Sequence, residues 1–166
     1  MNILYISISG NTRAFAKHLA EYAEKMHAED PVNPEVTLKE IHENSDFTKE
    51  TEPFFTFVPT YLDGGNGLDN GDTEILTETM REYLEHEDNH KLCLGVVGSG
   101  NKNFNNQYCL TAKQYAQTFG FPFLADYELR GTPSDVTRIY QILAENNKGS
   151  LSIRTDGLYK IKSGSE

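Results

Sequence analysis

The chain has 166 residues, of which 37% are hydrophobic and 24% charged, and its 15 basic and 25 acidic side chains give a net charge of −10. This length and apolar content suit one globular domain and exclude a disordered chain, while the acidic balance argues against nucleic acid as the main ligand. No apolar run reaches the roughly 20 residues that cross a bilayer, and two cysteines without a leader sequence predict a cytoplasmic protein that binds no membrane.

Strand-like and helix-like stretches alternate along the chain. Short apolar runs predict strands at residues 2–8, 36–41, 54–58, 91–97 and 123–129. Apolar residues at helical spacing predict helices at residues 15–26, 75–84, 110–119 and from Thr132-Pro133-Ser134-Asp135 onward, where the residue types favour a helix start. Because strands that alternate with helices form parallel sheets, we predict an α/β fold. It is a flavodoxin-like, doubly wound, five-stranded parallel sheet of order 2-1-3-4-5 with helices on both faces.

The two parts of the chain differ in composition. Residues 1–147 carry all the predicted strands and helices, so we expect them to form one flavodoxin-like domain. From Gly149 the chain is rich in Ser and Gly and is basic. We therefore interpret residues 148–166 as a polar C-terminal tail.

The first of three unusual loops leaves the first predicted strand at the edge where doubly wound sheets bind ligands. It combines hydroxyl, amide and glycine residues directly before a helix, at Ser7, Ser9, Gly10, Asn11 and Thr12. The free N–H groups of such a helix start attract phosphate, which neutral donors would hold here because the loop contains no Lys or Arg. An ordinary helix cap is the alternative. The loop lacks the Gly-Lys-Ser/Thr ending of a Walker A motif, and the chain has no dinucleotide glycine fingerprint.

The other two loops each place an aromatic residue among glycines or amides. The second loop contains Thr60, Tyr61, Gly64 and Gly65, and the third contains Ser99, Gly100, Asn101, Asn103 and Phe104. A flat heteroaromatic ring could lie against these aromatic side chains, with backbone groups at its polar edge. Alternatively, Phe104 packs on the sheet and the glycines only make turns. The sequence shows no catalytic acid, base or nucleophile and no metal-ligand spacing.

Acidic residues are concentrated in one part of the chain. The segment from Tyr61 to His90 has one base, Arg81, and accounts for −8 of the net charge of −10. Its nine acids are Asp63, Asp69, Asp72, Glu74, Glu78, Glu82, Glu85, Glu87 and Asp88. The segment is either a solvated helix face with an acidic loop, or a docking surface for a basic partner.

Three stretches are similar to one known family. They are Val58-Pro59-Thr60-Tyr61 with the glycines that follow, residues 98–104 (Gly-Ser-Gly-Asn-Lys-Asn-Phe), and residues 127–135 (Tyr-Glu-Leu-Arg-Gly-Thr-Pro-Ser-Asp). With these stretches the chain resembles the NrdI family over about residues 2–146. Members of that family are small flavodoxin-like flavoproteins that serve class Ib ribonucleotide reductase.

The resemblance implies bound FMN and an accessory flavoprotein rather than a stand-alone metabolic enzyme. In this family the reduced flavin, supplied with electrons by a donor that this sequence does not identify, reduces O2 to superoxide or peroxide. That oxidant helps to assemble the dimanganese-tyrosyl radical cofactor of the reductase small subunit. The resemblance also implies that the first loop holds the phosphate and that residues of the other loops flank the flavin, namely Tyr61, Gly64, Gly65, Asn101, Asn103 and Phe104. No catalytic side chain is then required, because the flavin carries the chemistry.

Other functions share parts of this pattern. A general electron-transfer flavodoxin or a diverged NrdI-like paralogue would have the same fold and cofactor. A phosphate-binding regulator of receiver-like fold is the non-redox alternative. It is disfavoured because residues 7–9 and 59–61 are not the acidic residues and acceptor Asp that a receiver has there.

Overall fold

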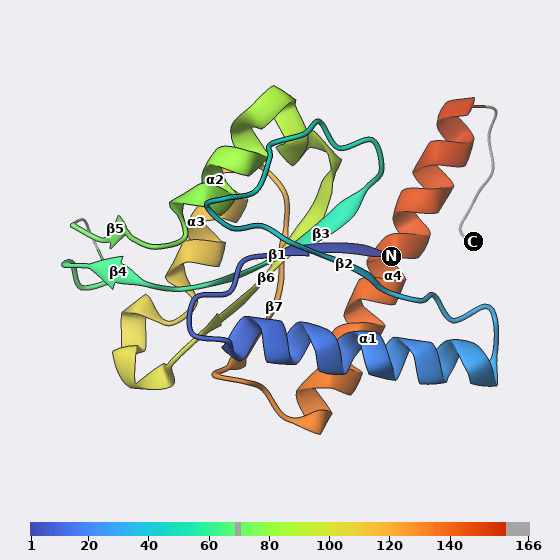
Figure 1. Cartoon of the computed structure of the whole chain (residues 1–166), viewed down its shortest axis with the longest axis horizontal. Coiled ribbons are helices and arrows are strands. Elements are labelled where there is room, and N and C mark those ends of the chain that lie inside the picture. The colour runs from blue at the N-terminus through green and yellow to red at the C-terminus, as the bar shows by residue number, and fades with distance from the viewer. Residues whose placement is uncertain (69–70, 159–166) are drawn as a thin grey trace.

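The computed structural model describes residues 1–68 and 71–158 (Figure 1). Its main sheet has five parallel strands in the order β2-β1-β3-β6-β7. The strands are β1 (Asn2–Tyr5), β2 (Thr37–Glu40), β3 (Phe54–Pro59), β6 (Cys93–Gly100) and β7 (Phe123–Glu128). Because β6 and β7 are the fourth and fifth strands of this sheet along the chain, the predicted order 2-1-3-4-5 is confirmed.

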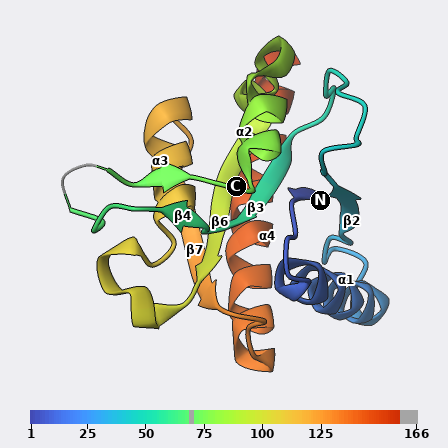
Figure 2. The same cartoon turned by 60° about the vertical axis from the view of Figure 1, so that its left-hand side comes forward.

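Helices cover both faces of the sheet, as predicted (Figures 1 and 2). The helices α1 (Asn11–Glu29) and α4 (Pro133–Leu158) pack on one face, and α2 (Glu78–Glu85) and α3 (Leu110–Phe119) pack on the other. Successive side chains of β1 alternate between the two layers, since Ile3 lies in the core under α1 and α4 and Leu4 in the core under α2 and α3. The sheet therefore separates two hydrophobic cores.

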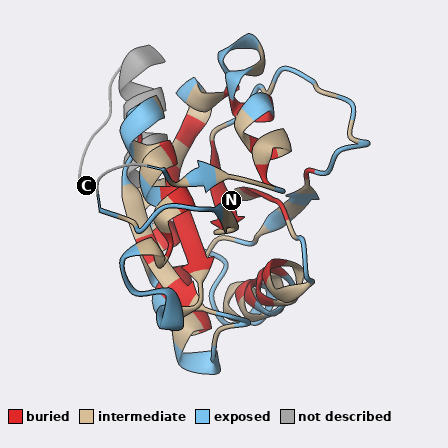
Figure 3. Ribbon diagram, turned by 90° about the vertical axis from the view of Figure 1, so that its left-hand side faces the viewer, coloured by how far each residue is buried: buried red, intermediate tan, exposed pale blue. Residues whose placement is uncertain are grey.

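The central strand β3 explains why the strands of the sheet are continuous apolar runs in the sequence. All six of its residues are buried, and Figure 3 shows the buried residues concentrated on the strands and on the inner sides of the helices. A parallel strand covered on both faces has no solvent side and needs no polar alternation.

The segment after β3 differs from the prediction. The second loop was expected to be irregular, but two short antiparallel strands, β4 (Leu62–Asp63) and β5 (Thr73–Glu74), form a hairpin there that projects beside the 3₁₀ helix η2 (Lys102–Gln107), as Figure 2 shows. A second 3₁₀ helix, η1 (His86–Leu92), links α2 to β6. Strands of two residues carry no periodicity signal, which is why the sequence did not reveal the hairpin.

Helix α4 begins as the sequence predicted. The Thr132 hydroxyl accepts from the Asp135 N–H at 3.2 Å, and the Asp135 carboxylate accepts from the Thr132 N–H at 2.8 Å, which is a reciprocal cap. The helix continues to Leu158, past residue 147, where the tail was expected to begin. The rest of that tail, residues 159–166, and Asp69 of the acidic segment lie outside the described residues. Within the described ranges, no helix is both long and apolar enough to cross a membrane.

Candidate functional site

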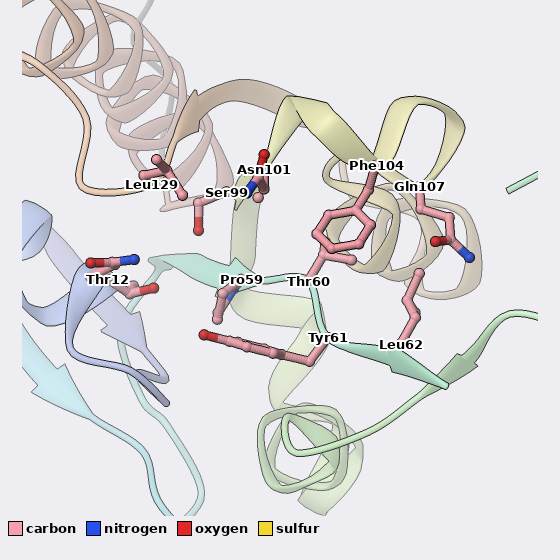
Figure 4. A pocket seen from close by; sticks show the side chains of 12 residues that line it. Thr12, Pro59, Thr60, Tyr61, Leu62, Ser99, Asn101, Phe104, Gln107 and Leu129 are labelled. Carbon is pink, nitrogen blue, oxygen red and sulfur yellow. The ribbon is translucent and has the colours of Figure 1, made fainter. Parts of the chain in front are cut away.

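A cavity of about 330 Å³ opens at the carboxyl edge of the sheet, where the order of the strands reverses between β1 and β3 (Figure 4). Its walls come from the start of α1, the segment after β3, the end of β6 with η2, and the first residue after β7. The lining residues are Asn11, Thr12, Pro59, Thr60, Tyr61, Leu62, Ser99, Gly100, Asn101, Phe104, Gln107 and Leu129.

One end of the cavity is formed by the N-terminus of α1. Gly10, at φ +93°, turns the chain sharply into the helix, and no atom lies within 4 Å of the position that a Cβ would take. The N–H groups of Asn11 and Thr12 have no acceptor inside the helix, because the first turn of any helix lacks one. The next N–H group, of Arg13, donates to the Ser7 Oγ at 3.2 Å. This end can therefore bind an anion.

A buried hydroxyl group lies beneath this end. Tyr127 is 2% exposed, and its ring stacks on Phe15 with centroids 3.8 Å apart. Its hydroxyl lies next to the side chains of Ser99 and Thr12, which line the cavity, but neither contact reaches the geometry of a full hydrogen bond within the part of the chain that the structure describes. A buried hydroxyl without a partner is costly, so this environment fits a bound polar group that would complete the hydrogen bonding.

The other end of the cavity is aromatic. In Figure 4 the Tyr61 ring extends along one side and the Phe104 ring lies across from it. The Tyr61 hydroxyl donates to the Ser9 Oγ at 2.9 Å and so joins the segment after β3 to the first loop. Phe104 is 63% exposed, so it does not pack on the sheet. The two rings leave room for a flat aromatic ligand whose outer edge would face solvent.

The β4–β5 hairpin is tied to η2 through Gln107, which itself lines the cavity. The Gln107 Nε2 donates to the Gly64 carbonyl at 3.0 Å and to the Asp72 Oδ1 at 2.6 Å, and the Gly67 N–H donates to the same carboxylate. Gly65 is at φ +79°, and a Cβ there would lie 2.2 Å from Asp72. These glycines are required by the backbone of the hairpin.

Eight of the fourteen cofactor-binding residues predicted from the sequence line the cavity, and they are Asn11, Thr12, Thr60, Tyr61, Ser99, Gly100, Asn101 and Phe104. Ser7, Ser9 and Gly10 lie in the adjoining first loop, and Gly64 and Gly65 lie in the hairpin. Asn103 does not line the cavity, but its N–H donates a hydrogen bond to the Asn101 Oδ1 at 2.9 Å.

Four lining residues were missed by the sequence analysis: Pro59, Leu62, Gln107 and Leu129. Pro59 and Leu62 flank Thr60 and Tyr61 in the second loop, and Gln107 follows the third loop directly. Leu129 belongs to residues 127–135, the third stretch that resembles NrdI proteins, so the signal was present there.

Comparison with known proteins shows the family of the chain. The sequence profile of the family described as NrdI flavodoxin-like matches residues 3–141. The chain belongs to that family. It is similar to an NrdI-like protein of Streptococcus pyogenes serotype M18, with 49% identity over 86% of this chain and 91% of the relative. It is also similar to the NrdI protein of Bartonella tribocorum, with 35% identity over 81% of this chain and 86% of the relative.

Solved structures agree on the fold. A short-chain flavodoxin associated with a bacterial microcompartment has a TM-score of 0.55 at 19% identity. The match covers 87% of this chain and 93% of the flavodoxin chain. The NrdI family binds FMN, which confirms the cofactor expected from the sequence. The NrdI family is associated with ribonucleotide reductase, so this flavodoxin-like chain is linked to that system.

Proposed function

We propose that this chain holds FMN in the cavity described above and supplies an O2-derived oxidant to the small subunit of a class Ib ribonucleotide reductase. There the oxidant assembles the dimanganese-tyrosyl radical cofactor. The observation that carries the proposal is one elongated cavity with an anion-binding helix start at one end and two aromatic rings at the other. When bound, FMN supplies the electron chemistry, in which its reduced form reduces O2 to superoxide or peroxide.

The start of α1 holds the phosphate in this proposal. The N–H groups of Asn11 and Thr12 donate to phosphate oxygens, and the helix dipole favours the negative charge. The Thr12 and Ser99 hydroxyls, which are nearly buried beside Tyr127, donate to the phosphate or to the sugar-alcohol chain. A ligand hydroxyl at this position also gives the Tyr127 hydroxyl its missing partner.

Tyr61 and Phe104 flank the flavin ring. The hydrogen bond from Tyr61 to Ser9 holds one ring in place, and the hydroxyl of Thr60 accepts from the Thr111 N–H at 3.2 Å, which fixes the backbone before it. Phe104 is largely exposed, so the outer edge of the site stays open to O2 and to a partner.

The hairpin glycines give the site an adjustable backbone. Gly64 and Gly65 are at φ +76° and +79°, a region where glycine can rotate its peptide at little steric cost. Rotation would exchange a carbonyl for an N–H in the hairpin, and Gln107 would then lose its bond to the Gly64 carbonyl. Gln107 therefore opposes the rotation.

The partner docks, in this proposal, on the acidic side of the hairpin and α2. Asp63 and Glu82 are exposed carboxylates of that side, whereas Asp72 and Glu74 are used inside the protein. Association with the small subunit should slow when salt rises from about 0.05 to 0.5 M, because salt screens exposed charges. Charge reversal at Asp63 and Glu82 should slow it as well, while reversal at the exposed Glu21 of α1 should not. Association insensitive to salt and to both reversals would leave the acidic segment as a solvated surface.

The decisive experiment follows radical formation. The FMN-loaded chain is reduced without oxygen and mixed with O2 and the Mn(II)-loaded small subunit, and the tyrosyl radical is measured by electron paramagnetic resonance. We expect radical well above that obtained with free reduced FMN. Superoxide dismutase and catalase, added separately, distinguish the two oxidants if the oxidant leaves the complex. FMN binding without radical formation would contradict the proposal and favour a general electron-transfer flavodoxin.

A further inference from the structure

The first loop contains no basic residue, and the nearest one in sequence is used elsewhere. The Arg13 guanidinium donates to the Glu40 carboxylate of β2 through Nε at 3.0 Å and Nη2 at 2.6 Å. This fork geometry is strong and directional. The hydrogen bonds from Arg13 hold the pKa of Glu40 below its usual range, as expected of a carboxylate that stays paired. Arg13 is thus engaged on the β2 side of α1.

A different arginine reaches the helix start. The Nη1 of Arg130 donates to the Oδ1 of Asn11, the first residue of α1, at 3.3 Å across 119 residues of sequence. Asn11 lines the cavity. Within the described ranges no carboxylate lies within ion-pair distance of Arg130, whose side chain is exposed. Its charge is therefore available to a ligand at the N-terminus of α1.

The backbone around Arg130 is held on both sides. The Leu129 N–H donates to the Gly100 carbonyl at the end of β6 at 3.0 Å, and Leu129 is at φ +55°. Gly131 is at φ +72°, and a Cβ there would lie 2.6 Å from the Phe15 ring of α1. Such left-handed residues persist only where the surroundings enforce them. The turn after β7 is consequently fixed against α1, with Arg130 at its exposed corner.

We infer that Arg130 is a cationic ligand of the terminal phosphate and gives this site its preference for FMN over riboflavin. The inference rests on the proposed function, which puts the phosphate at the start of α1. The unpartnered Tyr127 hydroxyl, buried next to Thr12, independently indicates a bound polar group at the same place. Arginine matches phosphate with two N–H donors, and a charge-assisted bond is about twice as strong as a neutral one. Riboflavin has no phosphate, so Arg130 adds nothing to its affinity.

The test is the dissociation constant of FMN and of riboflavin, measured by flavin fluorescence on the flavin-free protein. Arg130→Met keeps an unbranched, flexible side chain and removes the guanidinium with its charge. Lys17→Met is the matched control. It removes one positive charge from an exposed position of α1, more than a turn beyond Asn11. At about 0.05 M salt we expect Arg130→Met to weaken FMN about tenfold, or about 1.4 kcal/mol. Riboflavin affinity should not change, and Lys17→Met should bind both ligands as the unchanged chain does.

Three further measurements separate the loss of a charge from a loss of folding. FMN affinity of the unchanged chain should fall between about 0.05 and 0.5 M salt more steeply than that of Arg130→Met, because a screened charge has been removed. Arg130→Lys, which keeps the charge without the fork, should bind FMN with intermediate affinity. Thermal unfolding followed by circular dichroism checks that each variant folds. If Arg130→Met does not fold, Arg130→Lys is compared with the unchanged chain instead.

The outcomes are distinct. Unchanged FMN affinity in Arg130→Met overturns the inference and leaves the proposed function standing. Equal weakening of FMN and riboflavin also overturns it, since Arg130 would then act only through the structure of the turn. If the unchanged chain itself fails to bind FMN, the proposed function is wrong and the inference falls with it.

Discussion

The close approach of Gly131 to Phe15 predicts a large effect of one added methyl group. In Gly131→Ala the new Cβ would lie 2.6 and 2.7 Å from two carbons of the Phe15 ring, which is completely buried and stacked on Tyr127. An L-residue in the left-handed region costs about 1–2 kcal/mol, and overpacking a core adds about 1–3 kcal/mol. We therefore expect Gly131→Ala to lower the free energy of unfolding by about 2–5 kcal/mol.

Gly120→Ala is the matched control. Gly120 is at φ +85°, but no atom lies within 4 Å of the position that its Cβ would take, so only the backbone cost of about 1–2 kcal/mol applies. Urea unfolding of the flavin-free proteins, followed by circular dichroism, measures both values without the stabilisation that a ligand adds. Equal losses in the two variants would refute the packing of the turn against α1. Because that turn carries Arg130, Gly131→Ala should also weaken FMN, whereas Gly120→Ala should not.

Three more predictions concern the site and its support. Combined Ser9→Ala and Thr12→Ala should weaken FMN about tenfold or more in a fluorescence titration, because each neutral hydrogen bond contributes about 0.5–1.5 kcal/mol; unchanged affinity would contradict the phosphate site. Gly65→Ala should shift the flavin reduction potentials in potentiometry, since its Cβ would displace Asp72; unaltered potentials would mean that the hairpin does not sense the flavin. Glu40→Gln should destabilise the protein by about 1 kcal/mol at pH 7. The pKa of Glu40 is lowered on folding by Arg13, so its stabilisation is present above the ordinary pKa and is lost as the pH falls through the lowered value. Urea unfolding of both proteins at pH 7 and at a series of lower pH values should therefore show a difference in stability that shrinks as the pH falls.

Much of the fold could be predicted from short stretches of the sequence. The helix expected at residues 110–119 is α3 with the same bounds, and the cap predicted at Thr132 forms with Asp135. These features depend on apolar spacing and on residue types within a few positions of each other. The order of the sheet followed from the alternation of strands and helices, because right-handed crossovers leave few topologies.

The site was predicted only in part, for a physical reason. Tyr61 lies shortly after the end of β3, and Phe104 lies in η2 shortly after the end of β6. Both line the cavity, as their positions in the chain suggest. Gly64 and Gly65 looked equally suited, but the position of their hairpin depends on Gln107, which donates to Gly64 across 43 residues and to Asp72 across 35. Nothing in the local sequence of the second loop indicates that contact.

The sequence by itself determined the five strands of the main sheet, the α-helices and the positions of the three segments that carry the site, because these depend on periodicity and on the residues next to each strand end. Only the tertiary structure decided which charge and which buried hydroxyl lie beside the N-terminus of α1. Arg13, the neighbour in sequence, is paired with Glu40, while Arg130 and Tyr127 arrive from the far end of the chain. Charges and hydroxyls act over a few ångströms of space, and the folding of β7 against α1 sets those distances.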